Sequence, residues 1–141
     1  MPKMKPCKEA IQEIRGMVHD YPGAKVRCTM YPRKRPSFLK QMGVNLKDYE
    51  STGYIDYDTD LAKRIHREDA EYIEQYAEDM HTVWVLEHGI AAIPDETTRS
   101  IAEDTLLKRQ RCVDLMEKYK MAERTVRWHK LKALKIVSNF I

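Results

Sequence analysis

Hydrophobic residues recur at three- and four-residue intervals in several stretches of the chain, a spacing that predicts amphipathic α-helices. The first stretch covers roughly residues 7–19, and a much longer one runs from about Thr59 to His88. Further stretches lie between Pro94 and the end of the chain. We therefore predict a mostly α-helical protein in three segments: residues 1–58, 59–92 and 93–141.

The first segment is predicted to hold one short helix followed by a linker. The helix is expected to end at Asp20-Tyr21-Pro22-Gly23, because proline lacks a backbone donor and glycine readily forms turns. Residues 24–58 contain two more prolines and no sustained period, which predicts an irregular basic loop with a helical turn near residues 37–42. Within that loop, Arg33, Lys34 and Arg35 are a candidate arm along a DNA backbone, or else a solvated loop.

The second segment is predicted to be one long helix that begins at Asp58 or Thr59 and ends near Gly89. About 29 residues would form a rod of roughly 40 Å. Its apolar side is formed by Leu61, Ile65, Tyr72, Ile73, Tyr76, Met80, Val83 and Trp84. Such a stripe has to be covered by the N-terminal helix, by a second copy of the protein, or by both, so a homodimer through the central helix is a hypothesis.

The third segment is predicted to form three short helices, at roughly 95–108, 109–119 and 122–138, with a turn at Tyr119 to Met121. The inward residues are expected to be Ile101, Ala102, Thr105, Leu106, Val113, Leu115, Met116, Val126, Ala133, Leu134 and Val137. Trp128 is expected to pack against the long helix or the linker. This order is typical of a helix-turn-helix domain that binds double-stranded DNA.

Charge is distributed unevenly along the chain. The formal net charge of +3 conceals net charges of +6 in residues 1–55, −10 in residues 56–104 and +7 in residues 105–141. A basic end can neutralise DNA phosphates, whereas an acidic middle cannot. The balance therefore favours the last helix as the DNA-binding element.

Candidate DNA contacts follow from the predicted exposed side of the last helix. Arg124 and Arg127 are the expected base readers, since arginine can donate to both acceptors of guanine. Thr125 can contact a thymine methyl group or a phosphate, and Glu123 can accept from cytosine or simply favour the helix start. The expected phosphate contacts are Lys120, Lys130, Lys132 and Lys135.

The segment from Val113 to Val126 resembles the region 4-type helix-turn-helix of sigma factors, most closely at Arg124-Thr125-Val126 and at Lys132-Ala133-Leu134. Lys120 stands where that motif commonly has glycine, and Met116 where it commonly has alanine. The layout of the chain is similar to that of the ArpU/RinA group of phage late-gene transcriptional regulators. That resemblance implies a sequence-specific DNA-binding activator of late transcription.

Other functional classes find less support in the sequence. The five histidines and three cysteines lack the spacing of a metal site, and no nucleophile lies beside a base, so no enzyme, metal or cofactor is predicted. The apolar runs are too short to cross a bilayer, and we expect a cytoplasmic protein. Two alternatives remain: a phage DNA-packaging or assembly protein that uses the same helix-turn-helix, and a module that binds RNA polymerase through its acidic middle.

Overall fold

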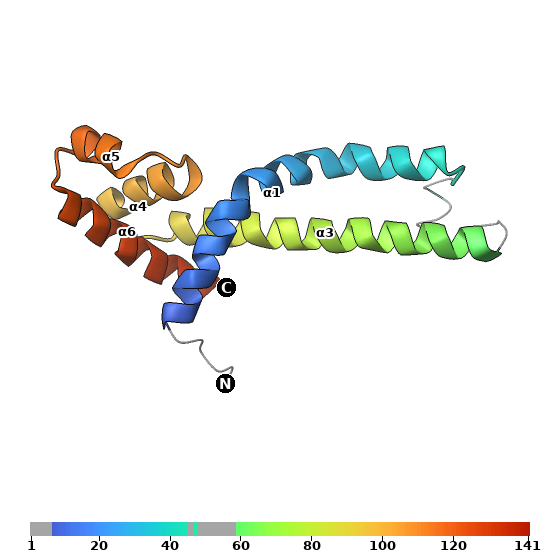
Figure 1. Cartoon of the computed structure of the whole chain (residues 1–141), viewed down its shortest axis with the longest axis horizontal. Helices are drawn as coiled ribbons and strands as arrows, with labels where there is room; N and C mark the ends of the chain where they lie inside the picture. The colour runs from blue at the N-terminus through green and yellow to red at the C-terminus, as the bar shows by residue number, and fades with distance from the viewer. Residues whose placement is uncertain (1–6, 45–46, 48–58) are drawn as a thin grey trace. The chain divides into compact units, whose positions relative to one another are not determined.

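The computed structural model describes residues 7–44, 47 and 59–141. This part of the chain is mostly α-helical and contains no strand, as the sequence pattern predicts. Figure 1 shows the helices, which are α1 (Cys7–Gln41), α3 (Thr59–Ala91), α4 (Glu96–Ala102), α5 (Cys112–Tyr119) and α6 (Glu123–Val137). A π-helical turn, Glu103–Leu107, follows α4, and a 3₁₀ turn, Ser138–Phe140, follows α6.

Helix α1 is far longer than predicted. It does not stop at Asp20-Tyr21-Pro22-Gly23, and it also continues through Pro32 and Pro36. The prediction of an irregular linker is therefore wrong for residues 24–41. Of the rest of that predicted linker, only residues 42–44 and Lys47 are among the described residues. A proline in a helix interior costs about 3 kcal/mol, so contacts with α3 must offset the three prolines.

Two compact units divide the chain, and their boundaries fall within α1 and α3 instead of at residues 58 and 92. We call Met1–Gly23 with His81–Ile141 the bundle unit, and Ala24–Met80 the hairpin unit. The bundle unit holds the start of α1, the end of α3 and everything that follows. The hairpin unit holds the rest of α1 and α3.

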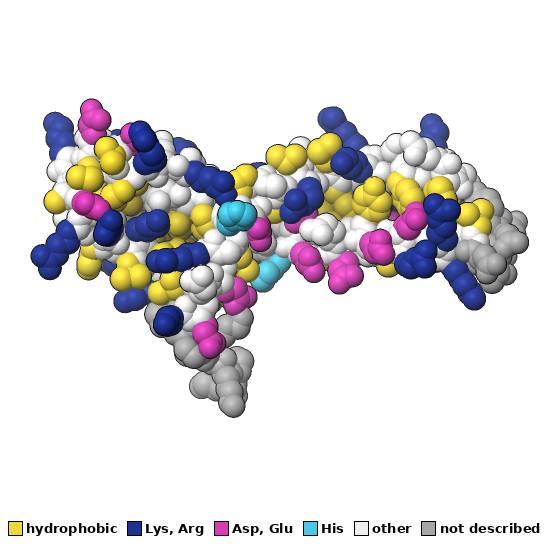
Figure 2. Space-filling view, in the orientation of Figure 1, with side chains coloured by type: hydrophobic (Ala, Val, Ile, Leu, Met, Phe, Trp, Pro, Cys, Tyr) yellow, Lys and Arg dark blue, Asp and Glu magenta, His cyan; other side chains and the backbone are white. Residues whose placement is uncertain are grey.

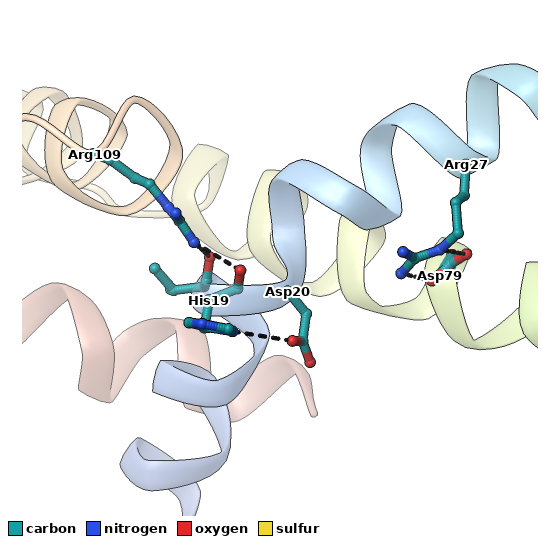
Figure 3. Close-up of polar contacts among 6 residues, drawn as sticks. His19, Asp20, Arg27, Asp79 and Arg109 are labelled. Atoms are coloured by element: carbon teal, nitrogen blue, oxygen red, sulfur yellow. Dashed lines mark hydrogen bonds and ion pairs between the residues drawn. The ribbon is translucent and has the colours of Figure 1, made fainter.

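In the hairpin unit, α1 and α3 run side by side (Figure 1). Among the described residues, two ion pairs join them. Arg27 donates to both carboxylate oxygens of Asp79 at 2.8 Å, a pair drawn in Figure 3. Arg35 donates to those of Asp69 at 2.7 and 3.1 Å. Both carboxylates are buried, and the two guanidinium groups supply the charges that compensate them.

Aromatic and aliphatic contacts also join α1 to α3. The rings of Tyr31 and Tyr76 stack with their centroids 3.9 Å apart, and Phe38 lies against Tyr72 at 5.4 Å. Leu39, Val44 and Ile65 form a small core near the end of α1. The positions of residues 24–41 that face α3 therefore combine apolar side chains with two arginines.

The hypothesis of a DNA-binding loop at Arg33, Lys34 and Arg35 requires correction. All three residues lie on α1, so they form no irregular loop. The side chain of Arg35 is only 15% exposed and is committed to Asp69. Arg33 and Lys34 are exposed on the helix surface.

The bundle unit has two hydrophobic cores. The larger joins Ile14 of α1 to α3, α4 and α6 through Val85, Leu86, Ile90, Ile93, Ala102, Leu106, Ala133, Leu134 and Val137. The smaller consists of Ile101, Leu115 and Val126 with partly buried neighbours. Helices α4, α5 and α6 therefore pack against one another through these cores, and the π-helical turn extends α4.

Candidate nucleic-acid interface

The turn between α5 and α6 fixes the start of α6. Lys120 ends α5 in the left-handed conformation with φ 53°, and the N–H of Met121 donates to the carbonyl of Met116 at 3.1 Å. Lysine takes the position that glycine usually occupies at such a helix end. Leu115 of α5 and Val126 of α6 meet Ile101 in the smaller core, so the two helices are held on α4 at a defined turn.

A buried carboxylate ties α5 to the π-helical turn. Asp104 is 3% exposed and accepts hydrogen bonds from Lys118 at 2.8 Å and from Tyr119 at 2.7 Å. Burial on its own would raise the pKa of Asp104, but these hydrogen bonds and the charges of Lys118 and Lys108 lower the pKa overall. The same contact raises the pKa of Lys118.

A second polar chain connects the start of α4 to α6. The backbone N–H and the hydroxyl of Thr98 donate to Asp95, which caps α4, at 2.9 and 2.5 Å. Thr98 Oγ1 also lies 2.8 Å from Nδ1 of His129. Because the single hydroxyl hydrogen points to Asp95, Nδ1 of His129 is the donor in that contact. The two hydrogen bonds from Thr98 lower the pKa of Asp95.

The first half of α6 presents its candidate base readers to solvent. Glu123, Arg124, Thr125 and Arg127 are all exposed, whereas Val126 between them is buried. Successive helix residues are separated by about 100°, so Arg124 lies opposite Val126 while Thr125 and Arg127 lie on opposite flanks. The four candidates therefore share one end of the helix but not a single face.

Arg127 already has a partner on its own helix. Its guanidinium forms an ion pair with Glu123, one turn earlier, and both side chains are more than half exposed. Among the described contacts, no ion pair involves Arg124. Glu123 also stands in the first turn of α6, where a negative charge is favourable.

The outer face of α6, formed by Arg124, Trp128, Leu131 and Lys135, is exposed along its length. Trp128 is 55% exposed, so the expectation that it packs against the long helix or linker is wrong. Its indole lies instead beneath the ammonium group of Lys132, at 5.0 Å from the ring centre. Val113 is also 65% exposed and does not point inward as predicted.

A hollow of about 520 Å³ lies beside α6 and carries cations that the sequence analysis missed. Its lining includes Arg127 and Lys130 of α6, with Arg109 and Arg111 of the loop between the π-helical turn and α5. Arg109 has φ 54° and donates to the backbone carbonyl of His19 at 2.7 Å, a contact that Figure 3 shows. This hydrogen bond holds the loop against α1. A local sequence pattern cannot predict it, because the two residues are far apart in the sequence.

No family model, curated protein or solved structure matches the chain. Within the described ranges, no helix is long and apolar enough to cross a membrane. The described side chains also include no cluster of three or more histidine, cysteine or acidic residues suited to a metal ion.

Proposed function

We propose that the protein is a sequence-specific regulator of transcription that binds double-stranded DNA through α6. The observation that carries this proposal is the exposed face of α6, which begins directly after the turn that follows α5. In helix-turn-helix proteins, the helix after the turn enters the major groove and its first residues reach base edges. Arg124 occupies that position, and Arg127 and Thr125 flank it.

Charge supports the same assignment. The exposed residues of α6 include Arg124, Arg127, Lys130 and Lys135, with Glu123 as the only acidic residue of the helix. Lys120 adds a further exposed cation at the turn, and Lys132 lies on the flank. These groups can attract phosphates irrespective of sequence, while Arg124 supplies discrimination between bases.

The resemblance to sigma region 4 and to the ArpU/RinA group extends the proposal to a biological setting. We propose that the DNA target lies in a promoter region of phage or prophage late genes, where the protein acts as an activator. Exposed acidic residues of α3, such as Glu74, then remain available for contact with RNA polymerase. Catalysis has no part in this proposal.

Selection of bound fragments from random duplex DNA, followed by sequencing, tests whether the full-length protein reads sequence. An enriched motif is expected. On that motif, Arg124→Ala should weaken binding by about 1–3 kcal/mol and leave affinity for random DNA nearly unchanged. Lys135→Ala should instead weaken both DNAs by similar factors and reduce the salt dependence.

Arg15→Ala is the matched control, because Arg15 is an exposed arginine on α1. It should leave both affinities unchanged. Equal losses on selected and random DNA with Arg124→Ala would remove that residue as a base reader. Retention of DNA without any enriched motif would favour a packaging or assembly protein, and binding to RNA polymerase without DNA affinity would favour an interaction module.

A further inference from the structure

The hairpin unit carries an exposed face whose apolar and charged residues are arranged in rows. On α1, Val26, Met30 and Lys34 are four residues apart and therefore lie in line. On α3, Glu71, Gln75 and Glu78 form the corresponding row. Met30, Lys34 and Gln75 line a common hollow of about 130 Å³, which places both rows on one side of the hairpin.

Apolar surface on this face remains open to solvent. Val26 is 57% and Met30 41% exposed, and the stacked rings of Tyr31 and Tyr76 are among the residues that line the hollow. A pair of helices cannot cover such a surface by itself, since each helix has only one flank turned toward the other. The face therefore suits an apolar partner surface of similar length.

Charge on the two edges of this face is opposite in sign. On the α1 edge Lys34 is exposed, and residues 24–41 contain no acidic residue. On the α3 edge Glu71 and Glu78 are exposed, and residues 68–80 contain no lysine or arginine. Arg27 and Arg35 do not add to the α1 edge, because they already pair with the buried carboxylates of Asp79 and Asp69. In Figure 2, lysine and arginine side chains gather over α1, acidic side chains over the middle of α3, and hydrophobic side chains between them.

We propose that this face binds a second copy of the same chain, with α1 of each copy over α3 of the other. The face is self-complementary, because its basic edge matches the acidic edge of an identical face turned by 180°. The pairing would form a four-helix bundle around Val26, Met30 and the two tyrosines.

Charge also selects one of the two possible symmetric arrangements. A twofold axis along the hairpin places α1 over α3 of the partner, so unlike charges meet. An axis across the hairpin places α1 over α1 of the partner, so like charges meet, which is unfavourable. Only the first arrangement is compatible with the charges, and in it the two hairpins point the same way.

This geometry identifies the residues that should face each other. A twofold rotation about an axis parallel to the helices leaves every residue at the same position along that axis. Within one hairpin, Arg27 pairs with Asp79 and Arg35 with Asp69. Lys34 of α1 therefore lies at about the same position along the hairpin as residues 70–72 of α3. Lys34 of one copy should therefore lie opposite Glu71 of the other.

Sedimentation equilibrium of the full-length protein tests the proposal without any DNA, so its outcome is independent of the proposed DNA binding. The unmodified chain should be a dimer. Lys34→Glu and Glu71→Lys should each raise the dimer dissociation constant by about tenfold or more. The double variant Lys34→Glu/Glu71→Lys should restore dimerisation, since the exchanged charges again meet across the twofold axis.

Lys25→Glu is the matched control, because it makes the same charge change at an exposed lysine that lies nine residues from Lys34 and therefore on the opposite side of α1. It should leave the dimer intact, and circular dichroism should show an unchanged helix content in every variant. A monomer at all concentrations, or a double variant no better than the single ones, would overturn the proposal. Loss of DNA affinity in Lys34→Glu with a monomeric parent would assign the face to nucleic acid instead.

Discussion

Asp104 shows how a single buried side chain positions the proposed DNA-binding helix. It lies in the π-helical turn and accepts hydrogen bonds from Lys118 and Tyr119, at the end of α5. Because α5 leads into the turn before α6, the Asp104 contacts fix where α6 begins. A π-helical turn places Asp104 at this point by adding one residue to the helical turn.

The pKa of Asp104 gives these contacts a measurable pH dependence. Its pKa is lowered in the folded protein, so the contacts stabilise the fold above the unfolded pKa of about 3.9 and are lost as pH falls below it. Asp104→Asn should reduce the free energy of unfolding by about 1–3 kcal/mol at pH 7. Urea unfolding should show this difference shrinking below about pH 4.

Asp114→Asn provides the control for that measurement. Asp114 is half exposed and lies 3.4 Å from Arg111 on the surface of α5, so its loss should change stability by less than about 0.5 kcal/mol. A stability difference for Asp104→Asn that stays constant between pH 7 and pH 3 would contradict the assigned cause.

The sequence predicted burial correctly where burial follows from the spacing of apolar residues along a helix. Val126, Ala133, Leu134 and Val137 follow the helical period and are buried as expected. Trp128 breaks that rule, because its size favours burial while its position on α6 lies opposite the buried side. Arg109 could not be found at all, since its contact with His19 joins residues 90 positions apart.

At the scale of elements, α1 is where sequence reasoning failed most clearly. Three prolines and Gly23 predict breaks, and the inward stripe of residues 24–41 is interrupted by Arg35. A charged residue at an inward position conceals the helical period unless its partner, Asp69 on α3, is known. The helix is stabilised by pairing with α3, and such non-local pairing leaves no local signal.

The crossing of α3 and α6 depends on a residue without a side chain. A Cβ atom added to Gly89 would lie 2.9 Å from Cγ1 and 3.3 Å from Cα of Val137. Gly89→Ala should therefore destabilise the protein by about 1–3 kcal/mol through overpacking, although alanine is the better helix former. Thermal unfolding followed by circular dichroism measures the change.

Gly16 supplies the opposite case within the same unit. It lies inside α1, and a Cβ atom there would meet nothing within 4 Å. Gly16→Ala should stabilise the protein by about 0.5–1 kcal/mol. The prediction would be contradicted if both substitutions changed stability in the same direction.

At the scale of the whole molecule, two units share two continuous helices. The proposed DNA-binding face lies in the bundle unit and the proposed dimer face in the hairpin unit. The sequence predicted the helical class and the order of the last three helices. The division into two units was not predicted, because it depends on pairing between residues 24–44 and 59–80.

The two proposals together define the symmetry of the DNA target. In the proposed dimer both hairpins point the same way, so both chains pass into their bundle units at the same end. We expect the selected DNA motif to contain two half-sites related by dyad symmetry. Inverting one half-site should abolish the gain in affinity that the second half-site provides, which a gel-shift titration can measure.

A Lys34→Glu chain provides the internal check on that expectation. It should still recognise a single half-site while losing the preference for paired ones. Equal affinity of the unmodified protein for one half-site and for two would contradict the expectation, even if DNA binding itself is confirmed.

The exposure of both tryptophans has a practical consequence for spectroscopy. Trp84 is 45% and Trp128 55% exposed, so each indole already meets water in the native state. Unfolding should move the emission maximum little, which makes the wavelength of intrinsic fluorescence a poor monitor of folding. A macromolecule that covers the outer face of α6 would dehydrate the indole of Trp128 alone. In Trp84→Phe protein, the remaining emission then becomes a label-free optical signal for occupancy of that face.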